Sequence, residues 1–148
     1  MNELNKVDRS WALFFSRQVL GFIFFMAGMY KVFQMGALEH ARNLFVEPYS
    51  GTFIPIWLLW LTGTAVPVIE LLAGALLIVG WRRREALIFL GFVLVLVTFG
   101  HLLKEPFYEF HTHVIPRLAL LLFILVFSQE EDRLSIDYLL KHRVKSVA

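Results

Sequence analysis

The sequence contains no cysteine and few charged residues. The chain has 148 residues, of which 18% are charged and 58% belong to the hydrophobic set, and its mean hydropathy is +0.66. The absence of cysteine excludes a disulfide-rich secreted scaffold, cysteine-ligated zinc, iron–sulfur clusters and thiol chemistry. The strong hydrophobicity excludes an intrinsically disordered chain. Because a soluble domain carries about a quarter charged residues, the composition favours a small multi-pass membrane protein.

Apolar runs divide the chain into four expected membrane-spanning helices. The hydrocarbon core of a bilayer needs roughly 20 apolar residues per helix. We therefore expect an all-α fold, an integral membrane four-helix bundle that forms a single domain over residues 1–148. The expected spans lie at about 11–34, 53–79, 85–103 and 110–128, and a C-terminal tail follows at 129–148.

Lysine and arginine gather on one side of these expected spans. Nine of them lie in the N-terminal tail, the turn between the second and third spans, and the C-terminal tail: Lys6, Arg9, Arg82, Arg83, Arg84, Arg133, Lys141, Arg143 and Lys145. The opposite loops carry only Arg42 and Lys104 outside the spans. Since positive residues favour the cytoplasmic side, both termini are predicted to be cytoplasmic, in the cell (cytoplasmic) membrane. A cleaved signal peptide is disfavoured because Arg17 and Gln18 interrupt the first apolar run.

Two further segments are amphipathic rather than spanning. Residues 36–49 predict a short element on the outer surface, with one apolar face (Leu38, Ala41, Leu44 and Phe45) and one polar face (Glu39, His40, Arg42 and Asn43). Residues 135–147 predict a tail helix that either lies on the cytoplasmic leaflet, where basic residues meet anionic lipid, or is solvated without a special role.

Four ionisable residues fall inside the expected spans, and they are Arg17, Lys31, Glu70 and Arg117. Each costs about 2.5–3.5 kcal/mol to insert on translocon scales, so each needs a partner. On the first span, Gly21 and Gly28 lie between Arg17 and Lys31, and the four residues share one helical face. The second span repeats this rhythm around Glu70. The two helices are therefore expected to pack face to face along seams of small residues.

Arg17 and Glu70 are predicted to form an intramembrane ion pair, because antiparallel helices place them at similar depth. Two interpretations of the pair stay open. It either fixes only the helix register, or it holds Glu70 as a catalytic group that supplies and accepts protons.

Cationic and hydrogen-bonding side chains gather toward the outer ends of the expected helices. Lys31 ends the first span, His101 lies at the end of the third, and His113 and Arg117 open the fourth. These four residues predict a binding pocket for a small oxyanion or a quinone carbonyl. A b-type haem held by His101 and His113 is disfavoured because both lie close to the membrane edge. A metal site at His111 and His113 is disfavoured because it lacks an obvious third ligand.

Two patterns of charged and small residues carry a family resemblance. They read Arg17-x3-Gly21-x6-Gly28-x2-Lys31 and Pro67-x2-Glu70-x3-Gly74-x5-Gly80, followed by a basic turn. With these patterns the chain resembles the DoxX family of small four-helix membrane proteins. The resemblance implies a membrane redox setting. The family takes its name from a subunit of a membrane thiosulfate:quinone oxidoreductase, and other relatives are linked to methylamine dehydrogenase maturation or oxidative stress.

The resulting hypothesis is a subunit or accessory of a quinone-linked redox system that binds a quinone or a small oxyanion in its outer half. Because no electron carrier is recognisable in the chain, a protein partner with flavin, haem or metal is expected, besides membrane lipid. A non-catalytic structural or assembly subunit of a larger membrane complex is the alternative. A small proton or solute transporter is the third hypothesis, and no nucleic-acid partner is expected.

Overall fold

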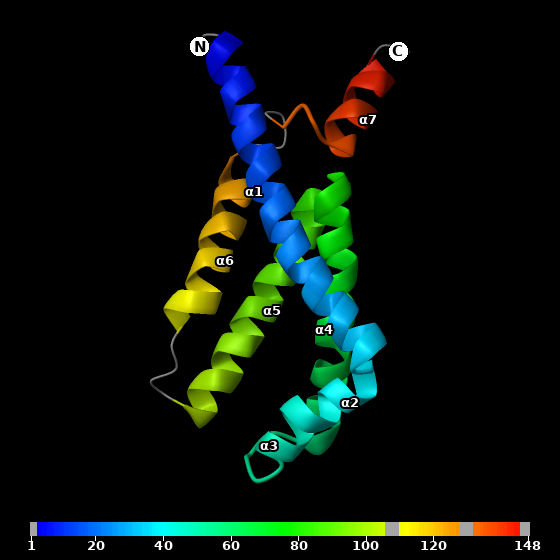
Figure 1. Cartoon of the computed structure of the whole chain (residues 1–148), viewed down its shortest axis with the longest axis vertical. Coiled ribbons are helices and arrows are strands. Elements are labelled where there is room, and N and C mark those ends of the chain that lie inside the picture. Colours follow the sequence, from blue (N-terminus) through cyan, green and yellow to red (C-terminus); the bar gives the residue numbers. More distant parts are fainter. Residues whose placement is uncertain (1–2, 106–109, 128–131, 146–148) are drawn as a thin grey trace.

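A computed structural model describes residues 3–105, 110–127 and 132–145 of the chain, which are helical apart from short turns and contain no β-strand (Figure 1). The elements in chain order are α1 (Glu3–Met29), η1 (Tyr30–Gln34), α2 (Ala37–Ala41), η2 (Arg42–Val46), α3 (Glu47–Tyr49), α4 (Ile56–Val79), α5 (Arg83–Lys104), α6 (Phe110–Val126) and α7 (Ile136–Lys145). The elements η1 and η2 are single π-helical turns.

Three of the described helical segments are long and apolar enough to cross a membrane: Lys6–Gln34, Ile56–Val79 and Arg83–Lys104. A shorter apolar segment, Thr112–Val126, makes up most of α6. The predicted helical membrane fold is therefore confirmed for the described residues. A fourth crossing stays a prediction.

Both termini lie at the same end of the molecule, whereas α2 and α3 lie at the opposite end (Figure 1). We name these the terminal end and the distal end. The basic turn between α4 and α5 lies at the terminal end, where Gly80 ends α4 in a left-handed conformation (φ 73°). The positive charges thus gather at one end as expected, and the cytoplasmic location of that end stays a prediction.

The helices α1 and α4 pack backbone to backbone, as the small-residue seams predict. A Cβ atom added to Gly74 would lie 2.5 Å from the backbone nitrogen of Phe25, and one added to Gly28 would overlap the backbone of Leu71. Neither position can hold a larger residue unless the two helices separate. The close approach fixes the register between α1 and α4, and therefore the depth at which their charged residues meet.

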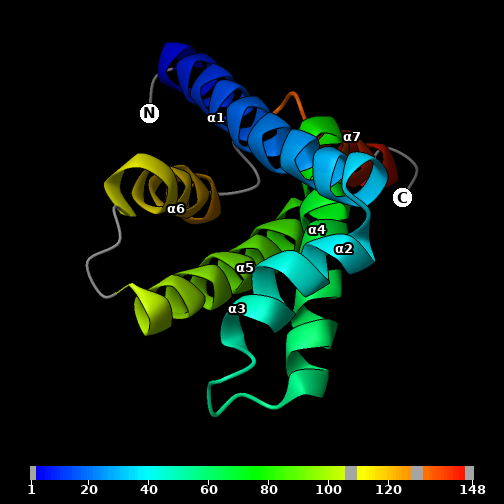
Figure 2. The ribbon, with the colours of Figure 1, turned by 60° about the horizontal axis from the view of Figure 1, so that its bottom comes forward.

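The buried core joins α1, α4, α5 and α6. Leu20, Phe24, Leu77, Leu90 and Leu121 belong to it and are almost fully buried. The helix α6 contacts both α1 and α5 (Figure 2). Phe24 therefore belongs to the buried core of the molecule, and any side chain that contacts its ring lies next to that core.

The predicted faces of the segment before α4 are wrong for His40 and Leu38, whereas the polar Glu39, Arg42 and Asn43 are exposed. His40 and Ala41, which were expected on opposite faces, are both buried, whereas Leu38 is 68% exposed. The cause is Gly63 of α4, because a Cβ there would overlap Ala41. The small residues of α2 therefore dock on α4, and His40 turns inward instead of facing outward.

Candidate functional site

At the terminal end, Arg17 is buried and donates four hydrogen bonds. Its Nε donates to Oδ2 of Asp132 (3.1 Å), and its Nη1 donates to the carbonyls of Leu77 (2.5 Å) and Ile78 (2.6 Å). Its Nη2 donates to the carbonyl of Leu134 at 3.1 Å. The guanidinium therefore ties α1 to the end of α4 and to the segment before α7.

Arg83 and two aspartates complete this cluster, which we name the terminal cluster (Arg17, Arg83, Asp132 and Asp137). Arg83 Nη1 donates to Asp132 Oδ2 at 2.6 Å, and its Nε donates to Asp137 Oδ2 at 3.2 Å. Asp137 also accepts the backbone N–H groups of Arg82 and Arg83, which caps the start of α5. Two positive and two negative charges balance here. Sequence reasoning missed both aspartates because they lie outside the apolar runs.

Glu70 pairs with Lys31 rather than with Arg17. Lys31 Nζ lies 2.6 Å from Glu70 Oε2, and Glu70 is buried while the Lys31 side chain is 24% exposed. The predicted Arg17–Glu70 pair is thus replaced by two other pairs. The α1–α4 register sets Arg17 opposite Leu77 and Ile78, seven and eight residues beyond Glu70. Lys31 lies in the π-helical turn η1, an irregularity that is frequent at functional sites.

A cavity of about 420 Å³ opens beside Lys31 at the distal end. Its walls come from α4, α5 and the segment from His40 to Pro55, and they are mostly apolar. The polar side chains that line it are Lys31, His40, Tyr49, Thr62 and His101. A mostly apolar cavity of this size with a few polar groups has the character of a small-molecule site.

His40 reaches the cavity wall as a neutral hydrogen-bonding group. Its Nδ1 lies 2.8 Å from the carbonyl oxygen of Gly63, which can only accept, so Nδ1 carries the proton and Nε2 is left as an acceptor. Burial lowers the pKa of His40. The Gly63 bond opposes this shift, the Lys31 charge adds to it, and the Glu70 charge opposes it. Sequence reasoning missed His40 because its position on α2 was assigned to the wrong face.

Tyr49 closes the same wall against α5. Its hydroxyl donates to the carbonyl of Gly100 at 2.9 Å. Burial raises the pKa of the Tyr49 hydroxyl, and the charge of Glu105 adds to this shift. The tyrosine therefore stays protonated and holds the α3 segment on α5.

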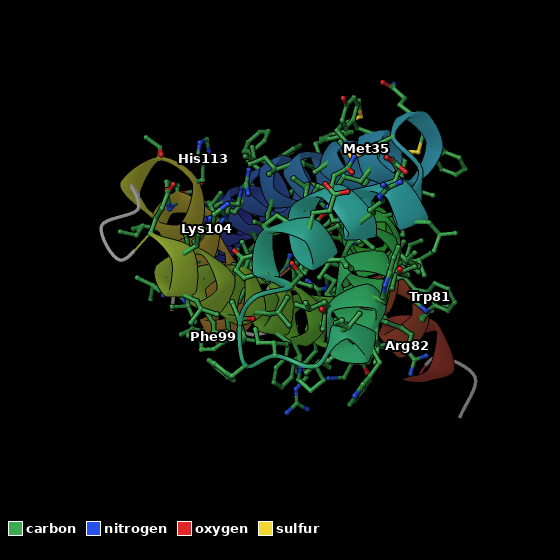
Figure 3. The ribbon with its side chains drawn as sticks, turned by 90° about the horizontal axis from the view of Figure 1, so that it is seen from below. Met35, Trp81, Arg82, Phe99, Lys104 and His113 are labelled. Atoms are coloured by element: carbon green, nitrogen blue, oxygen red, sulfur yellow. The ribbon has the colours of Figure 1, made fainter. Side chains whose placement is uncertain are left out.

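Only two of the four predicted binding residues line the cavity. Lys31 and His101 do, whereas His113 is exposed and lies at the periphery of the molecule (Figure 3). Arg117 also lies away from the cavity wall. The side chain of His111 lies outside the described residues. Among the described residues, no three histidine, aspartate or glutamate side chains are arranged to hold a metal ion.

Arg117 is half-buried and stacks on the core. Its Cζ lies 5.8 Å from the centroid of the Phe24 ring. A cation–π contact is worth about 0.5–1 kcal/mol at exposed sites and about 2 kcal/mol when desolvated. That contact offsets only part of the about 2.5–3.5 kcal/mol that an arginine costs inside a span. The ring contact alone therefore does not balance this charge.

The sequence matches the family described as methylamine utilisation protein MauE over residues 9–104. No curated protein matches the chain, and no solved structure does. The resemblance to the DoxX family is therefore wrong: it rested on short patterns of glycine and charge, which recur by chance in apolar helices. The matched range holds α4 and α5, the Lys31–Glu70 pair and the whole cavity lining. The chain belongs to the MauE family, a membrane protein family of methylamine utilisation.

Proposed function

We propose that the chain is an accessory subunit of a redox-linked system in the cytoplasmic membrane and that its distal cavity binds a quinone headgroup. The observation that carries this proposal is the cavity of about 420 Å³ with mostly apolar walls and with Lys31, His40 and His101 at its lining. Membership of a methylamine utilisation family, which belongs to a redox-linked process, supports the redox setting. Because no electron carrier is recognisable in the chain, a protein partner supplies it.

The charges around the cavity favour a quinone over an oxyanion. The positive charge of Lys31 is balanced by Glu70 at 2.6 Å, and burial keeps His40 neutral. An oxyanion would therefore enter an apolar site without a compensating charge, which is costly. A quinone is neutral, and its carbonyl oxygen needs only a donor such as the remaining N–H groups of Lys31.

Glu70 then holds Lys31 in position and takes part in the proton transfer that accompanies quinone reduction. Lys31 Nζ donates one hydrogen bond to Glu70 Oε2 at 2.6 Å, which leaves two N–H groups for a ligand in the cavity that Lys31 lines. Arg17 has no place in this chemistry, because its hydrogen bonds all lie at the terminal end. Its role in the proposal is to position α1 against α4.

The test is a cavity-filling substitution with a matched control on the same helix. Val97 lines the cavity, whereas Val95 is 66% exposed on another face of α5. In lipid nanodiscs titrated with decylubiquinone, we expect Val97→Phe to weaken binding at least tenfold, which corresponds to about 1.4 kcal/mol. Val95→Phe should leave the affinity unchanged. Absence of saturable binding to the unmodified protein, or equal weakening by both variants, would reject the proposal.

A further inference from the structure

The guanidinium of Arg117 lies at the depth of the apolar helices. Phe24, the ring it stacks on, is 1% exposed and belongs to the buried core. Phe24 is also part of the apolar helix Lys6–Gln34. The cation is therefore held beside the middle of a membrane-spanning segment, not at a helix end.

Arg117 contacts an aromatic ring, whereas Arg17, Arg83 and Lys31 contact carboxylates. Arg17 and Arg83 each contact Asp132, and Lys31 contacts Glu70. Within residues 3–105, 110–127 and 132–145, neither a carboxylate nor a carbonyl oxygen is bonded to Arg117; its contact there is the Phe24 ring. Arg117 is only partly buried, so part of this residue stays accessible from outside the chain.

An anion that pairs with Arg117 is expected from another molecule. Two sources, a second copy of this chain and lipid phosphates, are disfavoured by the structure. A second copy of this chain would have to offer a carboxylate at the same depth. Glu70 is buried and bonded to Lys31, and Glu85 lies in the first turn of α5 at the terminal end. Lipid phosphates lie at the membrane surface, whereas the Arg117 guanidinium is directed at the core ring of Phe24.

We propose that Arg117 marks a docking surface for a transmembrane helix of a different protein, and that this helix carries an aspartate or glutamate that pairs with the guanidinium. Charge complementarity selects the occupant, because a carboxylate completes both the charge and the hydrogen bonds of the arginine. The apolar side chains beside it on α6, Leu118 and Leu122, are exposed and complete the surface. This inference rests on the accessory-subunit part of the proposed function.

Photo-cross-linking of the full chain in its native membranes tests the proposal. With p-benzoylphenylalanine in place of Leu118, we expect one cross-linked protein other than this chain. Its cross-linked peptide should come from a membrane segment that contains an aspartate or glutamate. Arg117→Met should reduce the yield at least tenfold, and Arg117→Lys should retain most of it. The same probe at Phe92, which is 67% exposed on α5, should not capture this protein.

A charge swap makes the test independent of folding defects. Arg117→Glu should abolish the cross-link, and replacement of the partner's acidic residue by arginine should restore it. Cross-links only to lipid or to a second copy, or an undiminished yield with Arg117→Met, would overturn the proposal. An equal loss with Glu109→Gln would also overturn it, because the pairing anion would then belong to this chain. Val97→Phe should leave the cross-link unchanged, so that failure of quinone binding and failure of partner docking can be told apart.

Discussion

The two ends of the molecule hold buried charges in different ways. At the terminal end, two arginines and two aspartates bond to one another and to backbone groups. At the distal end, the Lys31–Glu70 pair lies beside a cavity of about 420 Å³. Arg17, Arg83 and Asp132 are almost fully buried, and their hydrogen bonds fix helices against one another. A charge pair that borders a mostly apolar cavity is available to a ligand.

The terminal cluster and the distal cavity are also built from different parts of the sequence. The terminal cluster links α1 and α5 to residues 132–137, which lie beyond the range matched by the MauE family. The cavity is built entirely within residues 31–101, inside that range. The ligand site therefore belongs to the part of the chain that defines the family, and the C-terminal segment adds a clamp to it.

The largest effect is expected from breaking the terminal cluster. Asp132→Asn leaves Arg17 and Arg83, both almost fully buried, without their shared carboxylate. Loss of one partner of a buried ion pair costs about 3–5 kcal/mol, so thermal unfolding of the purified protein should begin at a much lower temperature. Decylubiquinone affinity of the protein that remains folded should be unchanged. A stable Asp132→Asn variant would show that the cluster is not the clamp described above.

A smaller loss is expected at the Lys31–Glu70 pair, because Lys31 is partly exposed. Lys31→Met leaves the buried Glu70 carboxylate without its ion-pair partner. The free energy of unfolding should fall by about 2–3 kcal/mol, which is less than for a fully buried pair because Lys31 is partly exposed. The double variant Lys31→Met/Glu70→Gln should regain most of this stability, because it buries no unpaired charge. It should still bind decylubiquinone at least tenfold more weakly. If the double variant bound quinone normally, the pair would only fix the helices, like the terminal cluster.

A pH effect on stability should come from His40. Burial lowers the His40 pKa below its ordinary 6.5, so the unfolded chain takes up a proton that the folded chain does not. Stability is then present above pH 6.5 and falls as the pH drops below it, by at most about 1.4 kcal/mol per pH unit for one proton. His40→Gln, which can still donate to Gly63, should reduce this dependence between pH 7 and about 5.5. Identical melting profiles of the two proteins across this range would contradict the assignment.

The smallest effect is expected at the surface pair of the distal segment. Arg42 and Glu47 lie 3.0 Å apart, but their side chains are 59% and 56% exposed. Exposed pairs contribute about 0–1 kcal/mol, so Arg42→Ala should change the melting temperature within measurement error. A large shift would mean that the environment of η2 differs from solvent, for example through contact with a partner.

The sequence predicted the helices and the close α1–α4 packing, because both depend on local composition and on glycine spacing. It failed on pairing, since the partner of Arg17 depends on the α1–α4 register and on Asp132, 115 residues away. It also failed on His40, because Gly63 of a different helix decides which face of α2 turns inward. Both the partner of Arg17 and the orientation of His40 depend on contacts between distant segments, and such contacts produce no periodic pattern in the sequence.

The most direct test of the quinone site is photoaffinity labelling with an azido-quinone in native membranes, followed by mapping of the labelled peptides. The account predicts that the label falls on residues that line the distal cavity, among them Leu59, Leu96 and His101, and that excess decylubiquinone and Val97→Phe both suppress it. Label spread over the exposed faces of α5 and α6, unaffected by competitor or by Val97→Phe, would contradict it.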